Sequence, residues 1–205
     1  MATEDYSHLK LLFVDDAPHT RLLLREITRG SCWKNAEFVD NAFAAFEMIQ
    51  TSRPDLVITD WQMPGRNGLE LIHDIRQRPD SPDPLLPVIL LTASGDAGHV
   101  MAARDAGATG FLLKPISIGR ITEAVVNVVT RQPPFIISPG YKGPERRSAE
   151  RLANEDRQPQ APRTDVIKLP PDWLLLAKVR GEPFAIREAL RRRAEAIAIV
   201  RQFIR

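Results

Sequence analysis

Five side chains of the sequence could together carry out a phosphoryl transfer. They comprise three carboxylates, one hydroxyl and one ammonium group: Asp15, Asp16, Asp60, Thr92 and Lys114. Three converging carboxylates repel one another unless a cation lies among them, and such hard oxygen ligands suit Mg²⁺. An aspartate can accept the phosphoryl group as a nucleophile, while a lysine and a metal ion neutralise charge and a hydroxyl binds a phosphoryl oxygen. The set therefore predicts Asp60 as the acceptor, assisted by Lys114, Thr92 and Mg²⁺.

These five residues follow short apolar runs that indicate strands. The runs are continuous, as is typical of strands buried on both faces, and lie at residues 9–14, 37–39, 56–59, 88–92 and 110–113. Amphipathic patterns between and after them predict helices at residues 18–29, 42–52, 67–77, 97–106 and 117–131. This alternation predicts the α/β class, with a doubly wound, five-stranded parallel sheet and helices on both faces.

The positions of the five residues strengthen the chemical interpretation. Taken singly, an acidic residue after a strand is often only a turn or helix-cap residue. Ligands of open parallel sheets bind outside the carboxyl ends of the strands, and all five residues fall at that edge of one predicted sheet. We therefore expect the five side chains to converge.

Composition restricts the remaining classes of protein. The chain has 205 residues, of which 43% are hydrophobic and 26% charged, enough for one ordinary core and a further segment. Its single cysteine, Cys32, cannot form an internal disulfide, and residues 1–10 carry two acids and no apolar stretch of signal-peptide length. We therefore expect a cytoplasmic protein. No apolar run approaches the roughly 20 residues of a membrane span, so we expect no span.

Charge and proline content divide the chain into three parts. Residues 1–130 hold 12 Lys/Arg against 17 Asp/Glu, a net charge of −5, whereas residues 131–205 hold 16 against 9, a net charge of +7. Of the 17 prolines, 8 lie within residues 132–171 together with 12 charged residues, a composition typical of a linker. The sequence thus predicts a domain over residues 1–131, a Pro-rich charged linker over 132–171, and a basic amphipathic helical tail over 172–205.

The tail pattern predicts two helices. Asp172 is a candidate N-cap of the first helix, which ends near Gly181, and Pro183 begins a second helix that runs to Arg205. One face of the second helix is apolar and comprises Ile186, Leu190, Ala194, Ile197, Val200 or Arg201, and Ile204. A stripe with so many large apolar residues is an association site, so we expect a homodimer or packing on the first domain.

Other partners of the C-terminal part stay open. Arg187, Arg191 and Arg192 lie largely off the apolar face and could contact nucleic acid. A basic amphipathic helix could also lie on a membrane surface or dock on another protein. Within the predicted linker, residues 135–137 and 143–147 are candidate docking motifs, although solvated linker is the simpler interpretation.

Four sequence blocks resemble, in order, the receiver domains of bacterial two-component response regulators. The blocks are LLFVDD at residues 11–16, LVITDWQMPGRNG at 56–68, LTA at 91–93 and FLLKP at 111–115. The resemblance covers about residues 8–131 and implies a flavodoxin-like fold with strand order 2-1-3-4-5. It also implies a phosphorylation-controlled signalling switch, in which a sensor histidine kinase or a phosphotransfer protein supplies the phosphoryl group for Asp60.

The resemblance assigns roles to the residues of the site. Asp16 is expected to bind Mg²⁺ directly and Asp15 to bind it through water, while Asp60 and the backbone carbonyl of Gln62 complete the metal site. The family's lysine, here Lys114, pairs first with the acids and then with the phosphoryl group. The peptide bond that follows this lysine is usually cis in the family, so we expect a cis bond here.

Thr92 and Phe111 occupy the family's switch positions. The phosphoryl group is expected to draw in the Thr92 hydroxyl, and the Phe111 ring to fill the space left behind, which alters the face of the fourth helix, fifth strand and fifth helix. The expected output is a contact with an unidentified target protein, and the tail is expected near this face. Apart from self-directed phosphotransfer and autodephosphorylation, no enzyme activity is implied.

Two other functions stay open at this point. A DNA-binding transcriptional regulator could use the basic tail for its contacts. A Mg²⁺-dependent phosphohydrolase of the haloacid dehalogenase class also uses an aspartate at a strand end, but it needs a second acid two residues later, where this chain has Gln62. One segment departs from the receiver pattern: the loop at residues 78–87, with four prolines, is longer than the family needs. We expect this loop on the surface, away from the site.

Overall fold

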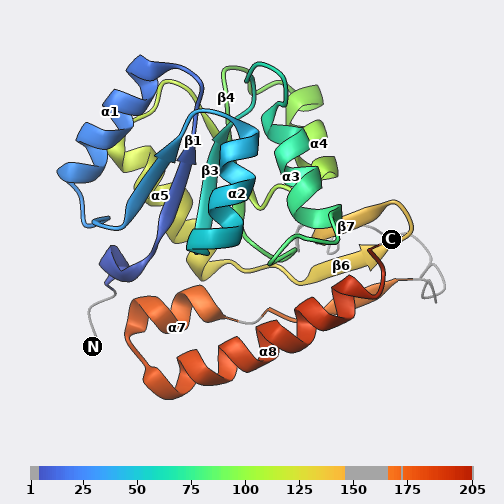
Figure 1. Cartoon of the computed structure of the whole chain (residues 1–205). Helices are drawn as coiled ribbons and strands as arrows, with labels where there is room; N and C mark the ends of the chain where they lie inside the picture. Colours follow the sequence, from blue (N-terminus) through green and yellow to red (C-terminus); the bar gives the residue numbers. More distant parts are fainter. Residues whose placement is uncertain (1–4, 146–165, 172, 205) are drawn as a thin grey trace, which may run out of the picture.

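The central sheet has the predicted doubly wound architecture. The computed structural model describes residues 5–145, 166–171 and 173–204, and Figure 1 shows the sheet in the upper part of the molecule with helices on either side. Five parallel strands pair in the order β2-β1-β3-β4-β5, which confirms the predicted fold class and strand order. The strands are β1 Leu11–Val14, β2 Ala36–Val39, β3 Leu56–Asp60, β4 Val88–Thr92 and β5 Gly110–Leu113.

Helices cover both faces of this sheet. They are a short 3₁₀ helix η1 Tyr6–His8, then α1 Pro18–Arg29, α2 Ala42–Ser52, α3 Gly68–Gln77, α4 Ala97–Ala106 and α5 Ile118–Thr130. Strands β1, β3 and β4 are buried along their whole length, because α1 and α5 pack on one face and α2 and α3 on the other. This double burial explains why the strands are continuous apolar runs in the sequence.

Side-chain caps fix where several of these helices begin. The side chains of Asn41, Asp96 and Ser117 accept backbone N–H bonds in the first turns of α2, α4 and α5. Asn67 and Glu70 form a capping box at the start of α3. Since each of these helices begins shortly after the end of a strand, the helix N-termini surround the edge of the sheet that carries the candidate site.

Part of the predicted linker forms a second sheet, so that prediction was wrong for these residues. Strands β6 Phe135–Ser138, β7 Tyr141–Pro144 and β8 Ile167–Leu169 pair antiparallel in the order β7-β6-β8, and we call them the accessory sheet. The strands have three or four residues, too few for an alternating pattern to stand out, and prolines flank them where edge strands tolerate proline. The candidate docking motif at 135–137 is therefore part of a strand in which Phe135 and Ile137 are buried. Residues 146–147 of the other candidate motif lie outside the described residues.

Two helices follow, as the sequence predicts. They are α7 Leu174–Arg180 and α8 Pro183–Arg201, which we call the helical hairpin. Gly181 ends α7 in the left-handed conformation, with φ of +64°, a frequent way to end a helix. Asp172, the predicted N-cap, lies outside the described residues. Within the described part of the chain, no helix is both long and apolar enough to cross a membrane.

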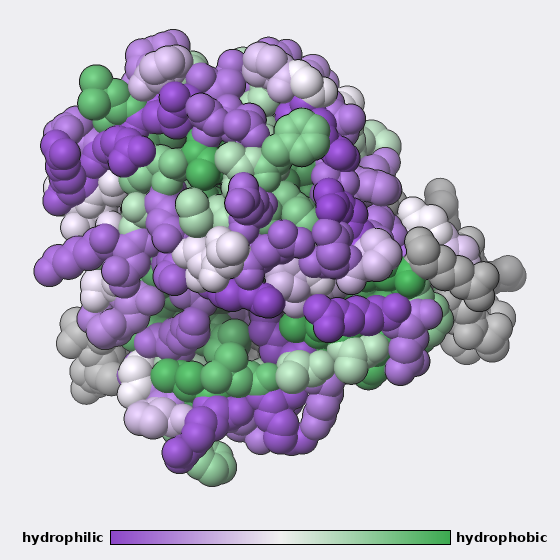
Figure 2. Space-filling view, viewed as in Figure 1, coloured by the Kyte–Doolittle hydropathy of each residue, from purple (hydrophilic) through white to green (hydrophobic). Residues whose placement is uncertain are grey.

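The packed face of α8 agrees with the predicted apolar stripe near its C-terminal end and differs from it earlier in the helix. Val200 is buried and Ile204 packs against the same cluster, as predicted. Ala189 is also buried and the Arg193 side chain is only 11% exposed, although neither belongs to the stripe, whereas Leu190 of the stripe is 48% exposed. In that earlier part the buried face is therefore rotated by about one residue from the predicted one, since small alanines allow close packing and Arg193 reaches a carboxylate. Leu190 and Ile197 instead line a groove of about 290 Å³. Figure 2 shows hydrophobic side chains along α8 and in the hollow above it.

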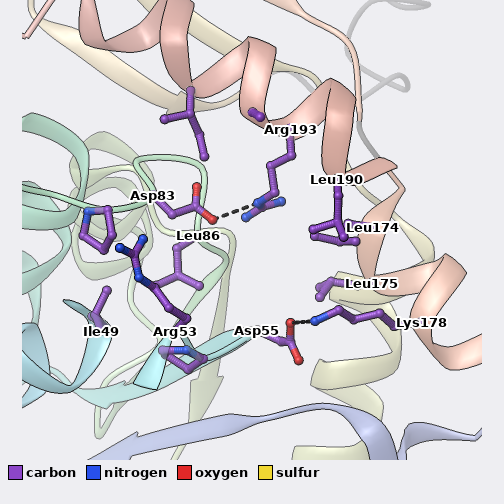
Figure 3. A pocket seen from close by; sticks show the side chains of 14 residues that line it. Ile49, Arg53, Asp55, Asp83, Leu86, Leu174, Leu175, Lys178, Leu190 and Arg193 are labelled. Atoms are coloured by element: carbon purple, nitrogen blue, oxygen red, sulfur yellow. Dashed lines mark hydrogen bonds and ion pairs between the residues drawn. The ribbon is translucent and has the colours of Figure 1, made fainter. Parts of the chain in front are cut away.

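The helical hairpin lies at the end of the sheet opposite the candidate site. It packs beneath the amino ends of the strands, where α7 contacts η1 and α5 (Figure 1). Ion pairs join it to the first domain, among them Lys178 with Asp55, and Arg193 Nε with Asp83 Oδ2 at 2.8 Å (Figure 3). The predicted position, near the face of α4, β5 and α5, holds for the contact of α7 with α5. It is otherwise wrong, because the carboxylates that attract the basic hairpin precede β3 and β4.

The loop at residues 78–87 lies away from the site, as predicted, and Pro79 and Asp80 are exposed, but the rest of the loop is packed more closely than the predicted surface loop. Ser81 and Leu86 are buried. Arg201 Nη2 donates to the carbonyl oxygens of Ser81 and Pro82, at 3.2 and 3.4 Å. The additional residues of this loop thus provide a docking surface for α8.

Candidate functional site

Three carboxylates converge at the carboxyl ends of β1 and β3, as the sequence predicts. Asp15 and Asp16 follow β1, and Asp60 is the last residue of β3. One oxygen atom from each carboxylate lies within 4.8 Å of the other two. Asp15 is fully buried and Asp60 is 8% exposed, so little water screens their mutual repulsion.

Lys114, just after β5, pairs with two of these carboxylates. Its Nζ lies 2.9 Å from Asp60 Oδ2 and 3.2 Å from Asp15 Oδ2. Burial acts to lower the pKa of Lys114, but the hydrogen bond and charge of Asp60, with the charge of Asp15, raise it overall. Burial raises the pKa of Asp60, and the opposing effect of Lys114 offsets this only in part. Three carboxylates and one ammonium group carry a net charge of −2, which fits a divalent cation.

Backbone contacts hold the turn that contains Asp15 and Asp16. Asp15 Oδ1 accepts a hydrogen bond from the backbone N–H of Ala17 at 2.9 Å. Arg21 Nη1, from the second turn of α1, donates to the carbonyl oxygens of Asp15 and Asp16 at 2.7 and 2.8 Å. Arg21 was not predicted as a site residue. The available signal was its place in a helix that begins directly after the acid pair, so that a long side chain can reach back.

A cavity of about 90 Å³, which we call the phosphoryl cavity, lies beside Asp60. Its lining comprises Asp60, Trp61, Gln62, Thr92, Ala93, Ser94, His99 and Lys114. The cavity thus brings together the predicted acceptor, lysine, hydroxyl and carbonyl-bearing residue. His99 was not among the predicted site residues.

The predicted switch residues are placed on neighbouring strands. Thr92 is buried, and its Oγ1 donates to the carbonyl oxygen of Ser94 at 3.0 Å and accepts from the Ser94 N–H at 3.1 Å. Phe111 on β5 is 43% exposed. This arrangement agrees with the expected state before phosphorylation, in which the hydroxyl has other partners and the ring lies outside. The exchange itself stays a prediction.

Two backbone features shape the edge of the site. The peptide bond between Lys114 and Pro115 is cis, as the resemblance implies. A Cβ atom on Gly68 would lie 2.2 Å from the carbonyl oxygen of Asp60 and 2.8 Å from Leu90 Cδ1. Only glycine therefore lets α3 begin so close to the end of β3. The Gly68 N–H donates to the carbonyl oxygen of Trp61 at 2.9 Å, which closes the intervening loop.

Comparison with known proteins agrees with this geometry. The family described as response regulator receiver domain matches residues 11–126. The chain belongs to this family. The matched residues begin with β1 and end within α5, so they include the whole central sheet and the carboxylate cluster. The accessory sheet and the helical hairpin follow the receiver domain and lie beyond the match.

The similarity to individual relatives is likewise confined to about 60% of this chain. Chemotaxis protein CheY-3 of Vibrio cholerae serotype O1 is 30% identical over 124 residues, which cover 60% of this chain and 94% of that protein. Response regulator protein PilR of Pseudomonas aeruginosa is 37% identical over 128 residues, which cover 62% of this chain and 28% of PilR. Among solved structures, the receiver domain of a signal transduction histidine kinase from Syntrophus aciditrophicus is 30% identical to this chain, with a TM-score of 0.52. The match covers 60% of this chain and 90% of the chain in that structure. The similarity is therefore one of receiver domains.

Proposed function

We propose that this receiver domain is a phosphorylation-controlled signalling switch with Asp60 as the acceptor. The donor in this proposal is a sensor histidine kinase or a phosphotransfer protein. The observation that carries the proposal is the convergence of Asp15, Asp16 and Asp60, with Lys114 2.9 Å from the acceptor. Mg²⁺ fits this donor set, in which the three carboxylates and the backbone carbonyl of Gln62 would hold it. When bound, the metal ion would neutralise charge on the phosphoryl group.

The side chains of the cavity have distinct parts in this proposal. An oxygen of Asp60 bonds to phosphorus while the bond from phosphorus to the donor breaks, and the donor keeps the electron pair. Lys114 Nζ, already within hydrogen-bond distance of Asp60, then pairs with a phosphoryl oxygen. Thr92 Oγ1 exchanges its bonds with Ser94 for one to the phosphoryl group. Hydrolysis restores Asp60, so the chemistry is confined to self-directed phosphotransfer and autodephosphorylation.

Labelling with a small acyl phosphate tests the acceptor. Asp60→Asn should abolish labelling by acetyl phosphate and Mg²⁺, because the amide is not a nucleophile for phosphorus. Mass spectrometry of the intact protein measures the added group. Asp40→Asn is a matched control, since Asp40 is an exposed carboxylate just after β2 at the same edge of the sheet. Undiminished Mg²⁺-dependent labelling of Asp60→Asn would refute the assignment.

We propose further that the output is a protein contact, controlled through the face of α4, β5 and α5 and through the C-terminal extension, residues 132–205. Support comes from β7, which packs directly on the end of α4. A Cβ atom on Gly107, the C-cap of α4, would lie 3.0 Å from the carbonyl oxygen of Lys142. A Cβ atom on Gly143 would lie 2.9 Å from Gly107 Cα. A displacement of α4 would therefore press on the accessory sheet.

Arg76 of α3 connects the same parts of the molecule. It is fully buried, and its guanidinium donates to the carbonyl oxygens of Gly107 at 2.9 Å and of Pro84 and Leu86 at 2.8 Å. The guanidinium carbon lies 5.7 Å from the ring centroid of Phe135 in β6. Burial lowers the pKa of Arg76 to about 10, so the group is still charged at neutral pH. One buried cation thus joins α4, the loop that docks α8, and the accessory sheet.

Hydrogen exchange tests this output route. Beryllofluoride with Mg²⁺ imitates a phosphoryl group on an aspartate, and we expect it to change amide exchange in α4 and also in β6 and β7. Asp60→Asn is the control, because it lacks the carboxylate to which beryllofluoride attaches. A change in α4 with none in the accessory sheet or α8 would exclude the extension from the route.

Neither alternative function gains support from the structure. Arg191 and Arg192 pair with Glu188, so a carboxylate already partners two of the three arginines that motivated nucleic-acid binding. Position 62 carries glutamine where a haloacid dehalogenase hydrolase needs its second acid. We therefore propose neither function, and the homodimer stays a prediction.

A further inference from the structure

A chain of side-chain contacts runs along one wall of the phosphoryl cavity. Ser94 Oγ donates to Asp96 Oδ2 at 2.5 Å, and the same carboxylate oxygen lies 2.5 Å from His99 Nδ1. The ring of His99 lies against that of Trp61, with centroids 4.8 Å apart and planes tilted by 56°. Since Trp61 directly follows Asp60, the chain of contacts ends beside the acceptor.

Asp96 fixes the position of His99 in two ways. As the N-cap of α4, it accepts a hydrogen bond from the His99 backbone N–H through Oδ1 at 2.9 Å, while Oδ2 holds the ring. The hydrogen bond from Ser94, followed by those from His99, lowers the pKa of Asp96 to about 2, so Asp96 is a carboxylate at neutral pH. Two contacts therefore place the His99 ring at the cavity wall: the Asp96 carboxylate at Nδ1 and the ring of Trp61.

We infer that His99 is a positioning residue that, together with Trp61, closes one wall of the phosphoryl cavity and slows the hydrolysis of phosphorylated Asp60. The inference rests on the proposed function. In hydrolysis, a water oxygen bonds to phosphorus, the bond from phosphorus to the Asp60 oxygen breaks, and the carboxylate keeps the electron pair. The proton of the water passes to solvent and inorganic phosphate leaves. Water must approach phosphorus from the side opposite the Asp60 oxygen. The rings of Trp61 and His99 line the cavity beside Asp60, so in this inference they narrow the path by which water arrives.

The same contacts connect this wall with the switch residue. Thr92 Oγ1 both donates to and accepts from the backbone of Ser94, whose side chain holds Asp96. When Thr92 turns toward a phosphoryl group, Ser94 loses both of these bonds. The chain contains three other histidines, His8, His19 and His73, and none of them lines the phosphoryl cavity. Among the histidines, His99 is therefore the one whose substitution should alter the lifetime of the phosphoryl group.

The lifetime of the phosphoryl group tests the inference. His99→Ala is compared with His73→Ala, a control at an exposed position of α3. Each protein is labelled with acetyl phosphate and Mg²⁺, the donor is removed, and the labelled fraction is followed by mass spectrometry of the intact protein. We expect His99→Ala to lose its phosphoryl group several-fold faster than the parent protein, and His73→Ala to match the parent. A lifetime of His99→Ala equal to or longer than that of the parent would overturn the inference.

Two substitutions of His99 distinguish a steric role of its ring from a hydrogen-bonding role. His99→Phe keeps a flat ring against Trp61 without the ring nitrogens, so its lifetime should return toward that of the parent. Recovery with His99→Gln but not with His99→Phe would mean that the side chain acts as a hydrogen-bond partner, which would overturn the wall. Urea unfolding of each variant shows whether a change in lifetime follows a change in stability. Labelling of the parent on Asp60 is measured first, because its absence would refute the proposed function, whereas labelling with unchanged lifetimes refutes only the role of His99.

Discussion

The charge on Asp60 depends on the balance between burial and a single ammonium group. Burial raises the pKa of the Asp60 carboxyl and Asp15 adds to the increase, while the hydrogen bond and charge of Lys114 act against it. Only the ionised carboxylate can attack phosphorus. Lys114 therefore keeps more of the acceptor in its reactive form before any phosphoryl group is bound.

Lys114→Met should raise the pKa of Asp60 further, because methionine fills similar space without a charge. As the pH falls, the variant should then lose the reactive carboxylate at a higher pH than the parent protein does. Titration of the Asp60 carboxyl by carbon-13 NMR in Mg²⁺-free protein measures this pKa directly. Lys34→Met, at an exposed lysine, is the control. An unchanged or lower pKa in Lys114→Met would contradict the balance described above.

Asp16 should matter more than Asp15 for Mg²⁺ binding, given the direct and water-mediated roles that the resemblance implies. We expect Asp16→Ala to weaken binding by on the order of tenfold or more. The fluorescence of Trp61 reports Mg²⁺ binding, because its ring adjoins the acceptor Asp60. Since the chain has three tryptophans, the Trp61→Phe variant shows which part of the fluorescence change comes from Trp61. Binding by Asp16→Ala as tight as that of the parent would show that the proposed metal geometry is wrong.

The strands that are buried on both faces, and the helices long enough to show an amphipathic repeat, could be predicted from the sequence. The predicted runs at 56–59 and 88–92 correspond to β3 and β4, because strands covered by helices on both sides are apolar throughout. The site followed from these strands, since Asp60 and Thr92 end them. The accessory strands were not predictable, because three or four residues carry too little alternation and the surrounding prolines resemble a linker.

Contacts of charged side chains with distant partners could not be predicted either. Arg76 is 1% exposed although arginine is rarely buried, because three carbonyl oxygens, two from the loop at residues 78–87 and one from Gly107, accept hydrogen bonds from its guanidinium. Arg193 turns toward the protein because Asp83 lies there, and this rotates α8 away from its predicted face. His99 lines the phosphoryl cavity, where Asp96 contacts its ring. The sequence shows the residue types but not these pairings, which depend on how the chain folds back on itself.

Gly143→Ala should separate β7 from the end of α4. The added Cβ would lie 2.6 Å from the Tyr141 hydroxyl oxygen and 2.9 Å from Gly107 Cα, both closer than van der Waals contact. We expect a loss of about 1–3 kcal/mol in the free energy of unfolding, measured in urea. Gly119→Ala is the control, because no atom lies within 4 Å of its Cβ position in α5 and alanine should stabilise the helix by up to about 1 kcal/mol. Equal stabilities of Gly143→Ala and the parent protein would contradict this packing.

In the whole molecule, the two oppositely charged parts of the chain meet at the amino ends of the strands. The pairs Lys178 with Asp55 and Arg193 with Asp83 join them there, and both pairs are partly buried. Partial burial makes such pairs less sensitive to salt than exposed ones. Leu175 and Val179 of α7 add apolar contact, because they share a core cluster with residues of α5. The described residues of the extension are thus packed on the receiver domain, and none of them lines the phosphoryl cavity.

A chain that ends at Arg131 should therefore be less stable than the whole protein. It lacks Leu175 and Val179, each of which stabilises the fold by about 1.5–3 kcal/mol when buried, and it leaves Asp55 and Asp83 without their cations. We expect a lower urea midpoint and faster hydrogen exchange in α5, whereas labelling by acetyl phosphate should persist because the site lies at the other end of the sheet.

Leu175→Ala in the full chain tests the same apolar contact without removing the extension, and should cost about 2–5 kcal/mol of unfolding free energy. The side chain is 2% exposed, so its removal leaves a cavity where α7 meets the core. Leu190→Ala is the matched control on α8, since Leu190 is 48% exposed and its truncation should change stability by less than about 1 kcal/mol. If Leu175→Ala and the truncated chain both unfold at the urea midpoint of the parent protein, the hairpin contributes nothing to the receiver core. The salt dependence of hydrogen exchange in α7 would then test its ion pairs with Asp55 and Asp83.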